Sequence, residues 1–289
     1  MTVSTAARTS PVVTHFAARA GDHNDRAMQG SGMIAAELAS RLDTAPVVVG
    51  TPEPALCTNW KDELAAARPA LRAMAQQYEH VFHSGGTPVT ALSRCAVALA
   101  TLPVLAKYRP DAVVVWFDAH ADLNTPESTT TGYLGGLALS GPLGMWDTGL
   151  GDGLKAENVI LCGARDIDPP EQSLIDQGVV TLLGMGPALT TRLRAAIAGR
   201  PVYVHIDCDV LEPGIVPTDY VVPHGLTLED LNALADVLAE HEVVGLEIGE
   251  FEAGEGLTGN DTTSPGPLLD ALQPLLEGAA LGCSGRRTD

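Results

Sequence analysis

Two acidic clusters carry the residues best suited to chemistry, WFDAHADLNTP at positions 116–126 and HIDCDVLEP at positions 205–213. In each cluster the potential metal ligands alternate along the chain, and they are Asp118, His120, Asp122, Asp207 and Asp209. Because alternate side chains of an extended chain project to one side, each cluster can direct its ligands into one cleft. Four carboxylates in a cleft repel one another unless protons or cations lie among them. The spacing therefore predicts a binuclear cation site.

Mn²⁺ is the cation that these donors favour. Two divalent ions about 3.5–4 Å apart are a common way to neutralise such a cluster, and oxygen ligands with one imidazole suit a borderline-hard ion. Acidic residues at strand ends also cap helices and turns, and that explanation would serve equally well for either cluster alone. Two clusters, each following an apolar run, favour a site for two Mn²⁺ ions.

The elements that must position these clusters are strands buried on both faces. VVVWF precedes the first cluster and VYVHI leads into the second, and such nearly continuous apolar runs are typical of strands in a parallel sheet. We expect strands at 11–15, 46–50, 80–83, 112–117, 158–163, 179–183, 202–206 and 243–248. We expect helices at 27–41, 61–77, 95–107, 171–177, 187–198, 228–240 and 267–276. This alternation predicts an α/β fold, a three-layer α/β/α architecture with a mostly parallel central sheet. In such sheets ligands bind beyond the carboxyl ends of the strands.

The composition indicates in which compartment the protein functions and which kinds of partner it binds. The chain has 289 residues, 45% of them hydrophobic, and we expect one domain over 1–289 with a frayed tail at about 282–289. A formal net charge of −19 disfavours nucleic acid and suits a small cationic substrate. Five cysteines without a CxxC pair, no signal peptide and no apolar run of spanning length predict a cytoplasmic protein without a membrane segment. A homo-oligomer is compatible with all of this.

Four segments resemble the ureohydrolase superfamily of arginases, agmatinases and related amidinohydrolases. They are DAHADLNTP, RDID at 165–168, DCDVLEP and LEIGEFE, and the resemblance extends from about 88 to 252. It implies an arginase-like fold and the hydrolysis of a guanidino C–N bond at two metal ions. The ligand roles that it implies are Asp118 and Asp207 as bridges, Asp122 on the first ion, and His120 and Asp209 on the second.

The resemblance also implies how a guanidino substrate is held. Glu250 matches the glutamate that holds the guanidinium, although by itself a glutamate after a strand would more simply be a solvated charge. Asn124, Thr131 and Asp168 match positions that contact the amino-acid end of the substrate. Glu250 and Asp209 are the residues that we expect to act in catalysis.

Two positions depart from the family pattern. Cys95, in LSRCAVAL, stands where the family supplies another histidine to the first ion, and we predict that its thiolate is a ligand there, although a buried inert cysteine is the alternative. Gly135, in TGYLGG, stands where arginases carry a proton-shuttling histidine. His224 and His83 are conceivable substitutes, but each is more simply explained as structural or exposed.

Both departures resemble the arginase-like branch that converts Nω-hydroxy-L-arginine to hydroxyurea and ornithine, and this is the substrate that we predict. The N-hydroxy group lowers guanidine basicity, which would reduce the need for a dedicated proton shuttle. An ordinary arginase or agmatinase that releases urea stays open, as does a metal-binding homologue without catalysis. Deacylation of acetylated polyamines or lysines fits the DxHxD spacing and Glu250 less well.

Overall fold

Eight parallel strands in the order β2-β1-β3-β8-β7-β4-β5-β6 form the central sheet of the computed structural model, which describes residues 10–254 and 264–281. The strands are β1 Pro11–Phe16, β2 Val47–Val49, β3 Thr87–Ala91, β4 Val113–Phe117, β5 Val159–Cys162, β6 Thr181–Leu183, β7 Val202–Asp207 and β8 Val243–Gly249. The helices are α1 Arg26–Arg41, α2 Trp60–His83, α3 Ala98–Tyr108, α4 Pro169–Asp176, α5 Leu189–Ile197, α6 Leu228–Ala239, α7 Gly266–Ala271 and α8 Gln273–Leu281. The predicted frayed tail lies outside the described residues.

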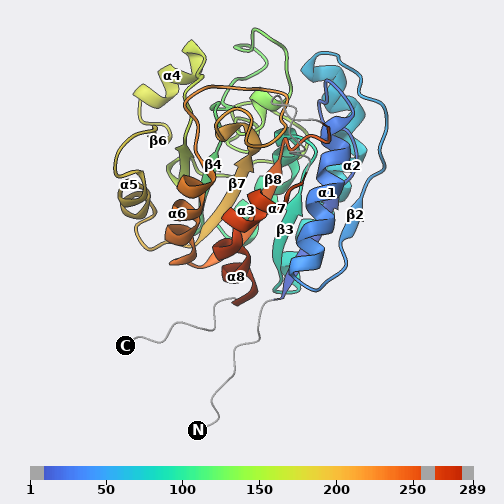
Figure 1. The fold of residues 1–289 in the computed structure, drawn as a ribbon. Helices are drawn as coiled ribbons and strands as arrows, with labels where there is room; N and C mark the ends of the chain where they lie inside the picture. The colour runs from blue at the N-terminus through green and yellow to red at the C-terminus, as the bar shows by residue number, and fades with distance from the viewer. Residues whose placement is uncertain (1–9, 255–263, 282–289) are drawn as a thin grey trace, which may run out of the picture.

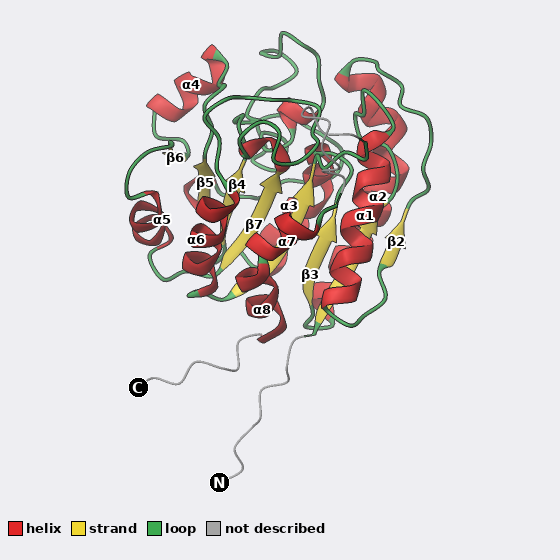
Figure 2. Ribbon diagram, in the orientation of Figure 1, coloured by secondary structure: helices red, strands yellow, loops and turns green. Residues whose placement is uncertain are grey.

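Helices cover both faces of this sheet (Figures 1 and 2). One apolar core joins the sheet to α1, α5, α6, α7 and α8, and a second core joins the opposite face to α2 and α3. Side chains of strand β4 pack into both cores. Val113 and Val115 face the first core, and Val114 and Trp116 face the second. The predicted three-layer α/β/α architecture is thereby confirmed, and every strand pairing in it is parallel.

The strand expected at 80–83 is wrong, because α2 continues to His83. Buried Met74, Tyr78 and Val81 lie three or four residues apart on one face of that helix. The strand at this point of the chain is β3, which the sequence prediction missed. It contains Pro88, a residue that is unusual inside a sheet because it lacks an N–H donor.

Two further boundaries differ from expectation. The helix expected at 95–107 begins as a short 3₁₀ turn, Cys95–Val97, and continues as α3. The helix expected at 267–276 is divided into α7 and α8 around Leu272. The first difference matters for the site, because Cys95 lies at the start of the turn that follows β3.

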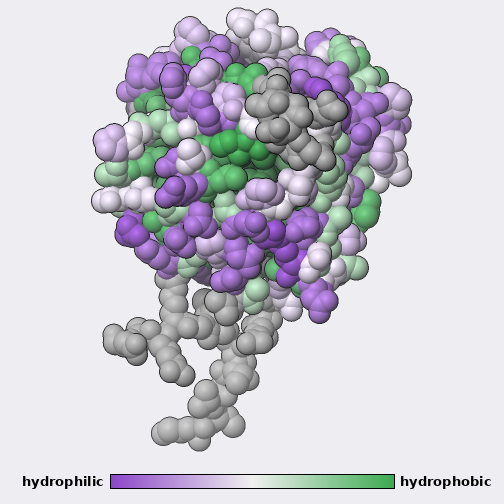
Figure 3. All heavy atoms as spheres, viewed as in Figure 1, coloured by the Kyte–Doolittle hydropathy of each residue, from purple (hydrophilic) through white to green (hydrophobic). Residues whose placement is uncertain are grey.

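Polar side chains cover most of the face shown in Figure 3, with apolar side chains gathered near its centre. Within residues 10–254 and 264–281, no helix combines the length and the apolar character needed to cross a membrane.

Candidate metal centre and active site

Four neighbouring strands deliver the predicted site residues to one edge of the sheet. In the order β3-β8-β7-β4, the chain leaving each carboxyl end carries Cys95, then Glu250, then the acidic cluster at 207–209, then the cluster at 118–122. The sequence predicted that ligands bind beyond the carboxyl ends of the strands, and these residues lie there. Residues far apart in the sequence thus meet because their strands are adjacent in the sheet.

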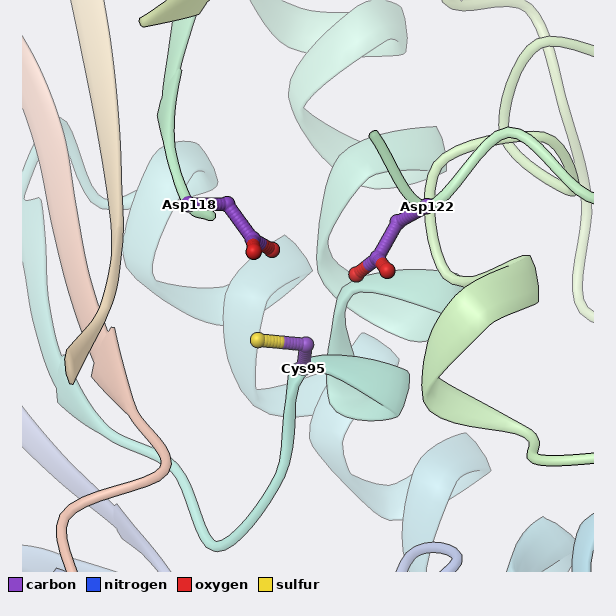
Figure 4. A group of neighbouring side chains, drawn as sticks. All are labelled: Cys95, Asp118 and Asp122. Carbon is purple, nitrogen blue, oxygen red and sulfur yellow. The ribbon is translucent and has the colours of Figure 1, made fainter. Parts of the chain in front are cut away.

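Among the described residues, two of the three groups of potential metal ligands share one aspartate. Donor atoms of Cys95, Asp118 and Asp122 lie within 4.8 Å of one another, and the same holds for Asp118, His120 and Asp209. Figure 4 shows the Cys95 thiol and the carboxylates of Asp118 and Asp122 directed into a common space. The sharing of Asp118 is the arrangement that a bridging ligand between two ions requires.

Asp207 joins these groups from the side of β7. It forms a third set of close donors with Cys95 and Glu250. Its Oδ1 accepts a hydrogen bond of 2.7 Å from the backbone N–H of Asp209. That bond turns the chain so that both aspartates face the same space as Cys95.

Burial and mutual repulsion disfavour ionisation of several of these acids in the absence of cations. Burial, followed by the charge of Asp209, raises the pKa of Asp118 to about 6. The pKa values of Asp122 and Asp207 are raised well above the usual range for the same reasons, burial first and neighbouring aspartates second. Asp209 differs: burial acts to raise its pKa, but its hydrogen bonds and the charge of His120 together outweigh burial and lower the pKa. Divalent cations would reverse the balance by favouring the ionised forms.

His120 is the cationic partner within the cluster. Its Nδ1 lies 3.0 Å from an oxygen of Asp209 and 3.3 Å from Asp118. Although burial acts to lower the pKa of His120, hydrogen bonds to the two carboxylates raise it. A bound cation would displace this proton, since a histidine ligand coordinates through a neutral ring.

Cys95 occupies a buried polar environment rather than an apolar one. Its Sγ lies 3.0 Å from Oδ2 of Asp207 and 3.1 Å from Nε2 of His205. Burial and the charge of Asp207 raise the pKa of the thiol well above its ordinary value. Without cations the side chain is therefore a thiol, and it can become a thiolate ligand only together with a bound ion.

His205 was not predicted, although it directly supports Cys95. Its Nδ1 lies 2.7 Å from Oε1 of Glu247, and its ring stacks on Trp116 with centroids 3.5 Å apart. Glu247 is held in turn by Tyr203, at 2.6 Å. These contacts fix the imidazole next to the thiol. The alternation of His205 with Asp207 and Asp209 was the signal that could have identified it.

Glu250 faces the site with a left-handed backbone, φ 64°. Its Oε1 accepts a hydrogen bond of 2.9 Å from the N–H of Cys95, and its Oε2 accepts one of 2.6 Å from Arg94. Arg94 is fully buried and also contacts Asp22 and Glu252. Because each oxygen already has a protein donor, Glu250 is fixed as a hydrogen-bond acceptor at the wall of the site. Sequence reasoning gave Arg94 no role.

A cavity of about 200 Å³ opens onto this centre. The residues predicted to contact the amino-acid end of the substrate, Asn124, Thr131 and Asp168, all line it together with Glu250. Asn124 donates a hydrogen bond of 2.8 Å to Asp168, which orients both side chains. Among the described residues that line the cavity, neither His83 nor His224 occurs, so neither is placed to carry protons there.

A parallel sheet with a carboxylate-rich centre beyond its strand ends is the architecture of a binuclear metal hydrolase. The chain matches the model of the arginase family over residues 24–264 and belongs to that family. It is 37% identical over 262 residues to the N(omega)-hydroxy-L-arginine amidinohydrolase of Streptomyces lavendulae, covering 91% of this chain and 96% of that one.

Solved arginases share the fold. The arginase from Bacillus subtilis superimposes with a TM-score of 0.76 at 20% identity, over 97% of this chain and 100% of that one. The Entamoeba histolytica arginase in complex with L-ornithine gives a TM-score of 0.79 at 18% identity, over 93% and 98% of the two chains. The resemblance to the ureohydrolases is confirmed.

Proposed function

We propose that this chain, as one domain in the cytoplasm, hydrolyses Nω-hydroxy-L-arginine to hydroxyurea and ornithine with two Mn²⁺ ions. The observation that carries the proposal is the 37% identity, over nearly all of both chains, to an enzyme named for that substrate. Cys95 in place of the expected histidine, and Gly135 in place of the shuttle histidine, agree with an arginase relative whose substrate is not arginine itself.

The donors fit a binuclear manganese centre. Asp118 and Asp207 would bridge the two ions, Cys95 and Asp122 would complete the first site, and His120 and Asp209 the second. The fit rests on the two donor groups that share Asp118 and on the raised carboxylate pKa values, which mark charge that lacks compensation. Two such cations would lower the pKa of a water molecule enough to make hydroxide available at neutral pH.

The protein's own groups orient the substrate. The Glu250 carboxylate accepts hydrogen bonds from the planar guanidino group and fixes its plane against the metal centre. Asn124, Thr131 and Asp168 bind the α-amino and α-carboxylate groups at the other end of the cavity. Asp209 accepts the proton of the attacking water. Together these contacts hold the guanidino carbon where attack is productive.

Steady-state assays with Nω-hydroxy-L-arginine, L-arginine and agmatine test the proposal on protein loaded with Mn²⁺. We expect hydroxyurea and ornithine from the first substrate with the highest kcat/KM. A clear preference for arginine or agmatine would assign the chain to the urea-releasing enzymes instead. No turnover of any guanidino compound, with metal bound, would support the non-catalytic alternative. Anomalous scattering at the manganese edge would locate both ions and show whether one lies beside the Cys95 sulfur.

A further inference from the structure

The space beside Gly135 is already filled by an aromatic ring. A Cβ atom built on Gly135 would overlap Cε1 of Tyr133 and lie 2.8 Å from its Cζ. Contacts this short exclude any side chain at position 135 while the tyrosine stays in place. Gly136, the next residue, has no atom within 4 Å of such a Cβ, so the restriction is specific to position 135.

Tyr133 is fixed against the wall of the cavity by two other rings. Its ring centroid lies 4.5 Å from that of His23 and 5.5 Å from that of Tyr220. Its hydroxyl lies 3.5 Å from Oε1 of Glu250, the oxygen that also accepts from Cys95. The phenol O–H is therefore placed next to the carboxylate assigned to the guanidino group.

We propose that Tyr133 is a catalytic residue of this enzyme, one that donates the proton taken up by the departing amine. The inference rests on the proposed hydrolysis of a guanidino substrate. The amine that leaves is that of ornithine whether or not the guanidino group is hydroxylated, so it needs a proton in either case. Glu250 is not placed to supply it, because both of its oxygens accept hydrogen bonds, one from the N–H of Cys95 and the other from Arg94.

The proton and electron balance of the step is simple. Attack of water on the guanidino carbon gives a tetrahedral carbon. When its bond to the ornithine nitrogen breaks, the electron pair stays on that nitrogen, which takes the proton from Oη of Tyr133. The phenolate then regains the proton that Asp209 took from the attacking water, relayed through the water molecule that replaces the product.

The charges of Glu250 and Arg94 act on the pKa of Tyr133 in opposite directions. Burial and the negative charge of Glu250 raise the pKa of Tyr133, so the hydroxyl holds its proton at neutral pH. The guanidinium of Arg94 acts in the opposite direction and favours the phenolate once the proton has left. Arg94 is fully buried, so its charge is poorly screened by solvent.

Tyr133→Phe tests the inference, because it keeps the ring and removes only the hydroxyl. We expect kcat for Nω-hydroxy-L-arginine to fall by about 10²-fold or more, the usual contribution of a positioned acid, with KM and calorimetric affinity for L-ornithine changed by less than about threefold. Tyr108→Phe, outside the cavity, is the matched control and should keep kcat. A Tyr133→Phe enzyme that keeps wild-type kcat, or that loses only affinity, overturns the inference. An inactive wild-type enzyme refutes the proposed function instead.

An exchange of residues provides the second test. Gly135→His alone should lose activity and thermal stability, since its Cβ meets the Tyr133 ring. Tyr133→Ala with Gly135→His restores the space and supplies a histidine as donor. We expect this double variant to exceed Tyr133→Ala by about tenfold or more in kcat. Equal activity of those two variants overturns the inference, because a new donor in the vacated space then has no effect.

Discussion

Replacing Asp118 by asparagine should change how the stability of the metal-free protein depends on pH. Burial and the charge of Asp209 raise the pKa of Asp118 from 3.8 to about 6 in the folded chain. Protonated Asp118 is therefore favoured by folding. The contribution of this protonation to the free energy of unfolding is fully present below pH 3.8 and is lost as the pH rises through about 6. Asp118→Asn carries no such titration.

The size of the effect follows from these two pKa values. At about 1.4 kcal/mol per pKa unit the full contribution is about 3 kcal/mol, and about 2 kcal/mol of it disappears between roughly pH 4.5 and 7.5. Asp118 is 1% exposed, so solvent screening reduces this little. With a urea slope of about 3 kcal/mol per molar, the midpoint should move by about 0.7 M.

Urea unfolding followed by tryptophan fluorescence, in EDTA at both pH values, measures the effect. On going to the higher pH, the free energy of unfolding of the wild type should fall by about 2 kcal/mol more than that of Asp118→Asn. Burial lowers the pKa of His15, so its titration changes the stability with the opposite sign. Because both proteins contain His15, its contribution cancels when the two are compared. Mn²⁺ at 100 times its Kd should increase the free energy of unfolding of the wild type by about 2.7 kcal/mol per site at roughly pH 7.5, and that of the variant by less. Identical pH dependence of the two proteins in EDTA would refute this reasoning.

Four other variants separate metal, substrate and packing roles. Cys95→Ala should lower manganese content from two ions per chain towards one by elemental analysis; an unchanged content would make the cysteine structural only. Glu250→Gln should lower kcat/KM by about 10- to 100-fold, the value of a charged hydrogen bond, without loss of bound manganese. Asn124→Ala should raise KM for Nω-hydroxy-L-arginine but not for agmatine, which has no carboxylate; equal effects would contradict its assignment. Gly245→Ala should lower Tm through a cost of about 1–3 kcal/mol, since its Cβ would lie 2.5 Å from the ring of Tyr203.

The sequence was sufficient for the fold where a strand is a short, nearly continuous apolar run. Strands β4 and β7 are fully buried and mostly apolar, and both were predicted within one residue of their ends. The prediction failed at 80–83, where VF between two histidines has the local character of a strand. Tertiary packing of Tyr78 and Val81 keeps that segment helical, while Pro88 obscures the true strand β3.

The site was predictable as far as its residues alternate within one segment. The structure brings the five predicted ligands of the two acidic clusters close together, although Asp209 lies in a 3₁₀ turn and Asp122 has a left-handed backbone rather than an extended one. Arg94, His205 and Tyr133 were missed because their roles depend on contacts across the fold. Arg94 pairs with Glu250 over 156 positions, and His205 meets the Cys95 thiol over 110. For Arg94 and Tyr133 no local pattern contains such information, since the fold creates the contacts. For His205 the alternation with Asp207 and Asp209 was a local signal, but it did not reveal the contact with Cys95.

Charge balance links the acidic clusters to the cysteine. Among the described residues, His120 is the one cationic side chain that forms ion pairs with the aspartates of the two clusters, and it pairs with two of the four, Asp118 and Asp209. Arg94 is engaged by Glu250, Asp22 and Glu252. Without ions the centre can reduce its repulsion only by taking up protons, as the raised pKa of Asp118 shows. If two divalent ions bind as proposed, the same carboxylates would ionise and the Cys95 thiol would lose its proton as well. Under this proposal metal binding and proton release would be one coupled event, and position 95 would tolerate a cysteine because the thiolate charge would appear only when the ions are present.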